Sequence, residues 1–216
     1  MDTKLIDMQP MVALARKLQT IVEAQQYDEI WSLLDKISVP EGFQPGIERC
    51  KEEGTGSNSF VTLTFPDGHT IRNNADDSEF WTYLSFEDSP MGAWQACLLK
   101  NLWHYLPLFW HALYVHKDYM YEREQLDKIP IGQELNECRL DKDFKEFNPS
   151  EYDIAPTIRY KGQSTKGNCY EVSMCSWASF GGLHRWHDDV FISHGKLFFI
   201  SWQGTCLYKY RLGLRY

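Results

Sequence analysis

Residues 187–202 have the sequence HDDVFISHGKLFFISW, in which His194 and Gly195 separate two apolar runs. A glycine-bearing pair between β-branched and aromatic runs is typical of a two-residue hairpin turn. Counting outward from this turn sets a register of opposite residues. The expected pairs are Ser193 with Lys196, Ile192 with Leu197, Phe191 with Phe198, Val190 with Phe199, Asp189 with Ile200 and His187 with Trp202.

The sequence around this hairpin shows the same pattern of apolar runs separated by turns. Apolar and aromatic runs at residues 154–160, 170–177, 185–193, 197–202 and 206–212 are separated by short, glycine-bearing turns. Runs of this length and spacing predict strands that follow one another in an antiparallel meander. We therefore expect residues 153–216 to form an antiparallel β region.

The part of the chain before residue 129 has a mainly helical pattern. Apolar residues at helical spacing predict helices over residues 10–25 and 28–37, and Ser89 followed by Pro90 predicts the start of a third. Pro66-Asp67-Gly68 predicts a turn between two short strands near residues 60–72. The prediction is an α+β fold in which residues 1–128 pack on one face of the C-terminal sheet, with 129–152 as a connection, in one compact unit.

Both faces of the 187–202 hairpin are apolar near its turn. A strand pair of this kind is typical of a sheet covered on two sides. Helices would cover one side, and the second cover could be a partner.

Composition limits the classes of function. The net charge is −8, which disfavours binding to phosphate backbones, and no strong basic patch offsets it. The first ten residues lack the apolar core of a secretory signal, and charged and polar residues interrupt the apolar stretch 98–115. Six scattered cysteines without metal-ligand spacing are expected to be reduced thiols. These features predict an intracellular, cytoplasmic protein that does not associate with membranes and binds neither nucleic acid nor a cofactor.

The chain also lacks the linear motifs of several enzyme classes. It contains no G-x-S-x-G, no P-loop and no G-x-G-x-x-G sequence. His104, His111 and His116 lie in one aromatic region, but His104 and His111 are about 10 Å apart on a helix, too far to chelate one ion.

The strongest catalytic candidates are His184, His187, Asp188 and Asp189, because imidazole and carboxylate groups build metal sites and acid-base pairs. On a strand, however, His184 and His187 point to opposite faces. Only His187 with Asp189, or His184 with Asp188, would then share a face. A turn after Gly181-Gly182 would instead let His184 and His187 converge.

Two acidic groups flank a predicted short helix near Phe80, and their members are Asp76, Asp77, Glu79, Glu87 and Asp88. With eight Trp, twelve Tyr and twelve Phe in the chain, they suggest a docking surface for a basic partner protein. The preferred hypothesis is an acidic protein-binding module, for example an inhibitor or immunity-type protein that captures another protein. The alternative is a metal-dependent hydrolase or nuclease-like enzyme that uses His184, His187, Asp188 and Asp189. The sequence leaves the partner and the oligomeric state open.

Overall fold

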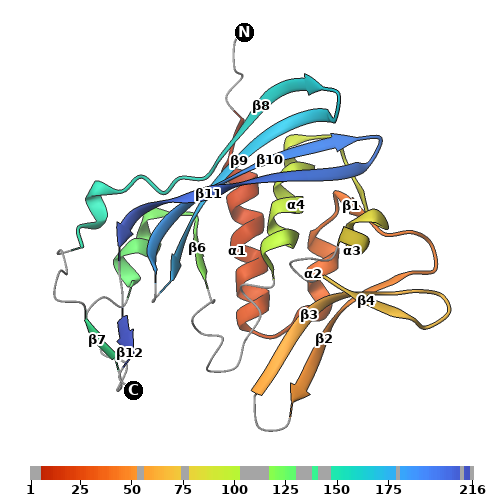
Figure 1. Cartoon of the computed structure of the whole chain (residues 1–216), viewed down its shortest axis with the longest axis horizontal. Helices are drawn as coiled ribbons and strands as arrows, with labels where there is room; N and C mark the ends of the chain where they lie inside the picture. The colour runs from red at the N-terminus through yellow and green to blue at the C-terminus, as the bar shows by residue number, and fades with distance from the viewer. Residues whose placement is uncertain are drawn as a thin grey trace.

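A computed structural model describes residues 6–52, 56–73, 78–102, 117–129, 138–140, 147–178, 181–209 and 212–214 (Figure 1). Its helical segments are α1 (Gln9–Glu23), η1 (Tyr27–Glu29), α2 (Ile30–Leu33), α3 (Ser78–Thr82), α4 (Pro90–Asn101), η4 (Arg123–Lys128) and η5 (Pro149–Glu151). Its strands are β1 (Ile37–Ser38), β2 (Gln44–Glu52), β3 (Gly56–Thr64), β4 (Thr70–Arg72), β5 (Ser85–Phe86), β6 (Asp118–Met120), β7 (Cys138–Leu140), β8 (Thr157–Ser164), β9 (Gly167–Ala178), β10 (Gly182–Ser193), β11 (Lys196–Lys209) and β12 (Leu212–Leu214). The fold is α+β with antiparallel strands, as predicted.

The largest sheet is antiparallel and has the strand order β11-β10-β9-β6. The strand β8 also pairs with β9, along its first half, while β6 pairs with its second half. The predicted C-terminal meander is therefore present, and it recruits β6 from the region before residue 129. The segment expected to be only a connection contributes β7, which pairs with β12.

The hairpin predicted from residues 187–202 is confirmed in its register. Ser193 pairs with Lys196, and every expected pair out to His187 with Trp202 is present. His194 and Gly195 have φ angles of 49° and 77°, the two positive values that a type I′ turn requires. A bulge in β11 follows Trp202, where the register shifts, and the sequence did not predict it.

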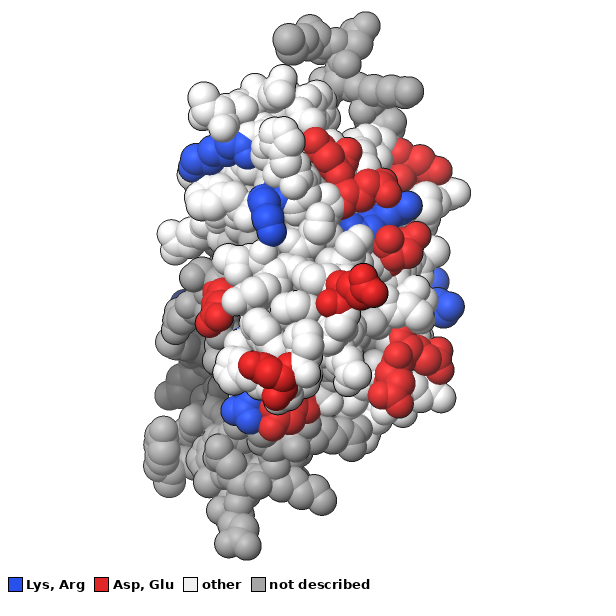
Figure 2. Space-filling model, turned by 90° about the vertical axis from the view of Figure 1, so that its right-hand side faces the viewer, with Lys and Arg blue, Asp and Glu red and all other residues white. Residues whose placement is uncertain are grey.

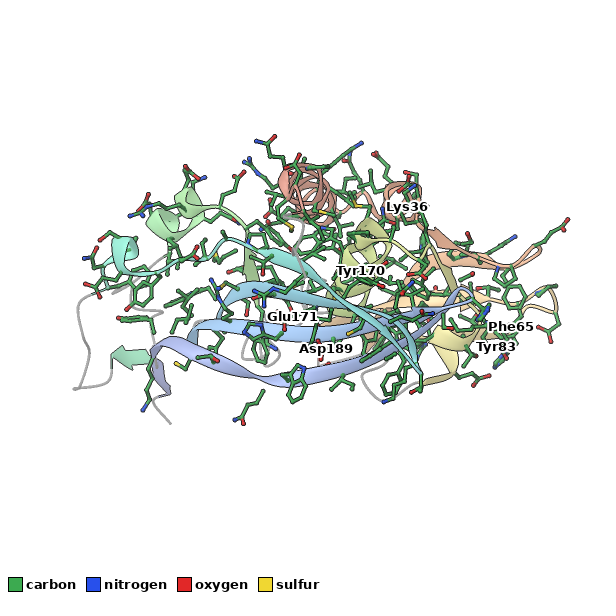
Figure 3. The ribbon with its side chains drawn as sticks, turned by 90° about the horizontal axis from the view of Figure 1, so that it is seen from above. Lys36, Phe65, Tyr83, Tyr170, Glu171 and Asp189 are labelled. Atoms are coloured by element: carbon green, nitrogen blue, oxygen red, sulfur yellow. The ribbon has the colours of Figure 1, made fainter. Side chains whose placement is uncertain are left out.

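The helices α1 and α4 cover one side of this sheet, which we call the inner face (Figures 1 and 3). On α1 the buried residues follow the expected helical spacing: Met11, Ala15, Leu18, Ile21 and Val22. The indole of Trp94 in α4 donates a hydrogen bond of 2.8 Å to the Met11 carbonyl and so ties the two helices together. No helix in the described ranges is long and apolar enough to cross a bilayer.

The predicted start of α4 is confirmed. Ser89 is its N-cap and accepts a hydrogen bond of 3.0 Å from the Gly92 amide, and Pro90 occupies the first turn. The helix is buried from Gly92 to Leu99, so it is the central helix of the molecule.

The helix predicted over residues 28–37 is shorter than expected. After α2 the chain leaves the helical conformation at Leu34, and Ile37 pairs with Phe86 in a small two-stranded sheet. The side chain of Gln95 accepts a hydrogen bond of 2.7 Å from the Lys36 amide, so contacts with α4 replace the last helical turn.

The region before residue 129 also contains more β structure than the short hairpin expected near residues 60–72. The strands β2, β3 and β4 form a three-stranded sheet, with nine residues in each of the first two. Val61, Leu63 and Ile71 are buried in the core. The sequence of β2 contains few apolar residues, which is why no period-2 pattern identified it.

On the opposite side of the large sheet, its outer face, the residues that the structure describes provide cover at one end. There a second apolar cluster joins η4 and the segment 147–154 to β9, β10 and β11 through Met120, Leu126, Ile154, Cys175, Trp177, Leu183 and Tyr208. Toward the His194 turn, Phe198 and Trp202 of β11 remain 47% and 54% exposed. Among the described residues, no element of the chain supplies the second cover expected there.

Candidate functional site

The four catalytic candidates lie on β10, which pairs with β9 in regular register. Side chains therefore alternate between the faces, and His184 and Asp188 point inward while His187 and Asp189 point outward. The expected divergence of His184 and His187 along a strand is present. Within the described ranges, no group of three His, Cys, Asp or Glu side chains could hold a metal ion.

Asp188 belongs to a partly buried ion pair beneath α4. Its carboxylate accepts a hydrogen bond of 2.5 Å from the Lys100 ammonium, which also donates one of 2.6 Å to Ser201. The Cys97 thiol lies 3.9 Å from the same carboxylate, and burial, then the charge of Asp188, raises its pKa. Through these contacts Lys100 joins α4 to β10 and β11.

Asp189 belongs to a separate network on the outer face. Its two carboxylate oxygens accept hydrogen bonds of 2.9 and 3.0 Å from Lys161, whose pKa is raised by that bond. Lys161 occupies a bulge in β8, between residues 160 and 162, which sets it apart from the regular pairing. The Trp202 indole donates a further hydrogen bond of 3.2 Å to Asp189.

The two histidines have different neighbours. His184 places Nε2 3.0 Å from the Gly181 carbonyl, and its ring stacks on Trp186 at a centroid distance of 5.8 Å. His187 stands opposite Trp202 and Ser173 in the sheet register. The four predicted side chains thus lie on two faces of β10, and the two aspartates belong to separate networks. His104, His111 and His116 lie outside the described residues.

The predicted partner-binding acids also have different environments. Asp76 and Asp77 lie outside the described residues. Glu87 forms an ion pair of 3.1 Å with Lys36, and its pKa is lowered by hydrogen bonding to Ser89 and then to Lys36. Asp88 accepts hydrogen bonds of 2.7 Å from Asn168 and 3.0 Å from Tyr170, and Glu79 accepts one of 3.3 Å from Tyr83. All three acids are exposed, and each has a partner within the fold.

Near Glu79, four rings form a contiguous group that we call the aromatic patch: Phe43, Phe65, His69 and Tyr83. Successive ring centroids lie 4.6 to 5.6 Å apart, and the three Phe and Tyr side chains are only half-buried. The labelled Phe65 and Tyr83 lie together at the end of the molecule opposite the second apolar cluster (Figure 3).

Local turn chemistry positions the aromatic patch. Phe65 and His69 flank the Pro66-Asp67-Gly68 turn. The Phe65 amide donates a hydrogen bond of 2.7 Å to the His69 carbonyl, and the Asp67 carboxylate accepts a hydrogen bond from the His69 amide. Tyr83 follows α3 and donates a hydrogen bond of 3.3 Å to Glu79. Burial, followed by the charge of Glu79, raises the pKa of Tyr83. Sequence reasoning found the turn but missed the patch, because Phe43 and Tyr83 reach it only through the tertiary fold.

Carboxylates outnumber basic residues in the sequence around this patch. Residues 26–88 contain thirteen Asp and Glu against four Lys and Arg, a net charge of −9, while the whole chain carries −8. The view onto this end shows several separate acidic groups, with basic groups among them (Figure 2). Glu41, Asp67 and Glu79 are exposed. We call residues 26–88 the acidic end.

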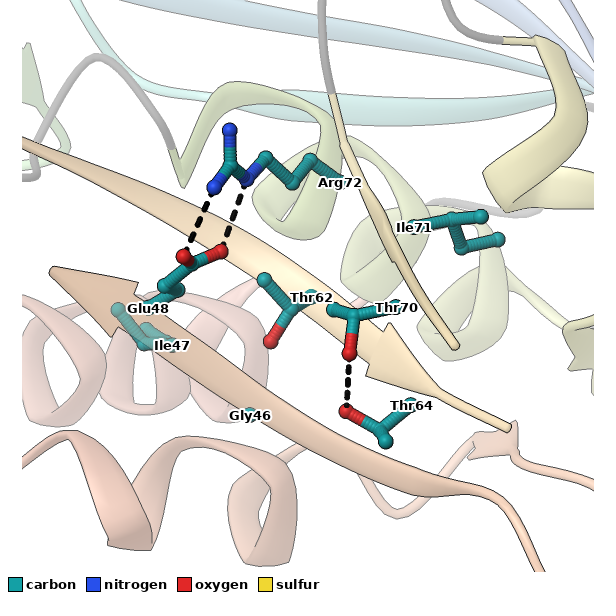
Figure 4. Close-up of a pocket in the computed structure, with 8 residues that line it drawn as sticks. All are labelled: Gly46, Ile47, Glu48, Thr62, Thr64, Thr70, Ile71 and Arg72. Carbon is teal, nitrogen blue, oxygen red and sulfur yellow. Dashed lines mark hydrogen bonds and ion pairs between the residues drawn. The ribbon is translucent and has the colours of Figure 1, made fainter. Parts of the chain in front are cut away.

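A hollow of about 550 Å³ lies on the three-stranded sheet of the acidic end (Figure 4). Its charged lining is already paired, since Arg72 donates two hydrogen bonds of 2.8 Å to Glu48. The hydroxyls of Thr64 and Thr70 lie 3.0 Å apart beside it. These two threonines precede Phe65 and follow His69 directly, so the hollow adjoins the aromatic patch along the chain.

The aromatic patch and its carboxylates suit a cationic ligand. Arg and Lys side chains stack on aromatic faces and pair with carboxylates, and both features are present here at one end of the molecule. No family model, no curated protein and no solved structure matches this chain.

Proposed function

We propose that the protein is a protein-binding module that captures a partner with a basic surface at its acidic end. The observation that carries the proposal is the aromatic patch on the part of the chain that holds all of the net negative charge. Half-buried rings supply apolar contact area that is already ordered, and exposed carboxylates steer a basic partner and fix its orientation. An inhibitor or immunity-type protein would act in this way.

The enzyme alternative rests on His184, His187, Asp188 and Asp189. A shared metal or acid-base site would need these side chains to converge, and they point to two faces of β10. Their carboxylates are also already paired with Lys100 and Lys161. The geometry therefore favours the binding module.

Affinity capture from the native extract, followed by measurement of association rates at two salt concentrations, tests the proposal. The key variant carries Asp28→Lys, Glu41→Lys and Glu79→Lys, three exposed acids of the acidic end. Its matched control carries Glu124→Lys, Asp127→Lys and Glu151→Lys, which change the net charge equally on η4 and η5. We expect slow association and a flattened salt dependence for the key variant only.

A second arm separates the two functions. The double variant His184→Ala with His187→Ala should bind the captured partner as the wild type does. Equal weakening by both charge variants would show a dependence on net charge alone and remove the acidic end from the proposal. A turnover that the histidine variant loses, with normal binding by the key variant, would favour the enzyme.

A further inference from the structure

The strand β11 forms an edge of the large sheet, since within the described residues it pairs only with β10. It is fourteen residues long and has no charged residue and no proline between Lys196 and Lys209. Natural edge strands are usually short, charged, kinked or covered, because an open edge can pair with another chain. Figure 3 shows β11 on the side of the sheet farthest from α1.

The bulge in β11 protects only part of this edge. It begins after Trp202, and the pairing from Lys196 to Trp202 is regular. A bulge twists a strand and ends its capacity for further pairing. The seven residues next to the His194 turn are therefore the part of the edge that remains suitable for pairing.

The register fixes which backbone groups point away from β10. In a two-residue hairpin the residues that flank the turn form a hydrogen-bonded pair, and hydrogen-bonded and non-bonded pairs then alternate. Because Ser193 pairs with Lys196, the backbone groups of residues 196, 198, 200 and 202 point toward β10. Those of Leu197, Phe199 and Ser201 point toward the open edge.

Two exposed aromatic side chains stand on the outer face of the same seven residues. Phe198 is 47% and Trp202 is 54% exposed, with Ile200 between them. The hydrogen bond from the Trp202 indole to Asp189 holds this ring in place, and Lys161 balances the charge of Asp189. An ordered and exposed tryptophan is typical of the residues that contribute most to protein interfaces.

We propose that β11 pairs antiparallel with β11 of a second copy of the chain, about a two-fold axis at Ile200. This register places Phe198 of each copy opposite Trp202 of the other, and Ile200 opposite Ile200. These are non-bonded pairs, in which side chains approach most closely. The hydrogen-bonded pairs are then Phe199 with Ser201, whose backbone groups point outward. An interface in which the same patch meets itself is the commonest kind in homodimers.

The charge distribution favours a second copy in this orientation. The segment 197–203 is uncharged and so places no like charges opposite each other. The turn beside the acidic end, where the Gly195 carbonyl accepts from the Phe86 amide, lies about 5.5 residues from the axis. Antiparallel pairing thus separates the two turns by about 36 Å, several times the screening length at physiological salt.

Sedimentation velocity tests the proposal, and we expect the wild type to have twice the mass of one chain. Ile200→Lys and Ile200→Glu each place like charges on the axis and should weaken self-association by at least about tenfold. An equal mixture of the two variants should associate again, because each lysine then meets a glutamate. This recovery also shows that both variants are folded.

Cross-linking tests the register. In a Cys206→Ser background, Ile200→Cys should form a disulfide-linked dimer on mild oxidation, because residues on the axis meet within bonding distance. Thr205→Cys, exposed on the same strand, should not. A monomeric wild type, a mixture that stays monomeric, or equal cross-linking of both variants would overturn the proposal. If the wild type is a monomer and Ile200→Lys abolishes binding of a captured partner, the β11 edge pairs with a strand of that partner and not with a second copy. The mass and cross-linking measurements are independent of partner capture at the acidic end.

Discussion

At the scale of single residues, two adjacent aspartates have taken separate structural roles. Asp188 pairs with Lys100 beneath α4, and Asp189 pairs with Lys161 on the outer face. The side chains in the first pair are 9% and 27% exposed, and in the second 7% and 40%. A buried charge of this kind costs much more when it loses its partner than the pair contributes as a whole.

A double-mutant cycle on Lys100 and Asp188 should show this coupling. Lys100→Met leaves a buried carboxylate and should lower the free energy of unfolding by about 3 kcal/mol. Asp188→Leu leaves a lysine that can partly reach water, and should cost about 2 kcal/mol. The double variant should lie within about 1 kcal/mol of the wild type, as measured by urea denaturation. Additive costs would show that the two residues contribute independently.

At the scale of elements, local signals predicted some structures well. The two apolar runs and the His194-Gly195 turn between them predicted the register of the β10–β11 hairpin, and Ser89-Pro90 predicted the start of α4. In both cases neighbouring residues carry the information. The strand β2 was not predicted, because its side chains are mostly polar. The helix α2 ends earlier than predicted, because Gln95, which is distant in sequence, accepts a hydrogen bond from the Lys36 amide.

The turn of the hairpin offers a direct test of the element. Gly195→Val should lower the free energy of unfolding by about 1 to 3 kcal/mol, because a β-branched residue resists a φ of 77°. Gly195→Asn is the matched control, since asparagine tolerates this conformation and should cost less than valine does. Both side chains meet the same Ser85 hydroxyl, so their difference reports the backbone. Equal costs in thermal or urea unfolding would contradict a type I′ turn in solution.

The candidate site shows why function was harder to predict than the hairpin. Glu79 was identified from the sequence, but Phe43, Phe65 and Tyr83 lie in loops beside three separate elements, and no linear spacing relates them. Conversely, His184, His187 and Asp188 are close in sequence, but strand alternation places His187 on the opposite face from the other two. Proximity along a strand is therefore a poor guide to a shared site, as the parity of the two histidines already indicated.

At the scale of the whole molecule, charge and polarity are distributed unevenly. The acidic end carries a net charge of −9, so the rest of the chain is close to neutral, with eighteen Lys and Arg against seventeen Asp and Glu. The two proposed interfaces follow this division. The acidic end offers aromatic rings with carboxylates, and the β11 edge offers an uncharged strand.

The global fold also makes a prediction about alkaline stability. Cys97 and Cys175 are fully buried free thiols, and burial raises the pKa of both. In the unfolded chain these thiols lose their protons near pH 9, while in the folded protein they keep them to higher pH. The folded state then binds more protons, so stability falls as the pH rises above about 9. Each thiol contributes up to about 1.4 kcal/mol per pH unit to this fall.

The measurement should compare slopes among variants, because another group acts in the opposite direction. Burial, and then the charge of Lys100, lowers the pKa of Lys117, so its contribution to stability rises with pH up to about its unfolded value of 10.5. Cys97→Ala and Cys175→Ala should each make the fall of unfolding free energy between pH 9 and 10.5 less steep, whatever cavity cost they add at neutral pH. Cys206→Ala, which removes an exposed thiol, should leave the slope unchanged. Three identical slopes would show that the buried thiols do not govern alkaline unfolding.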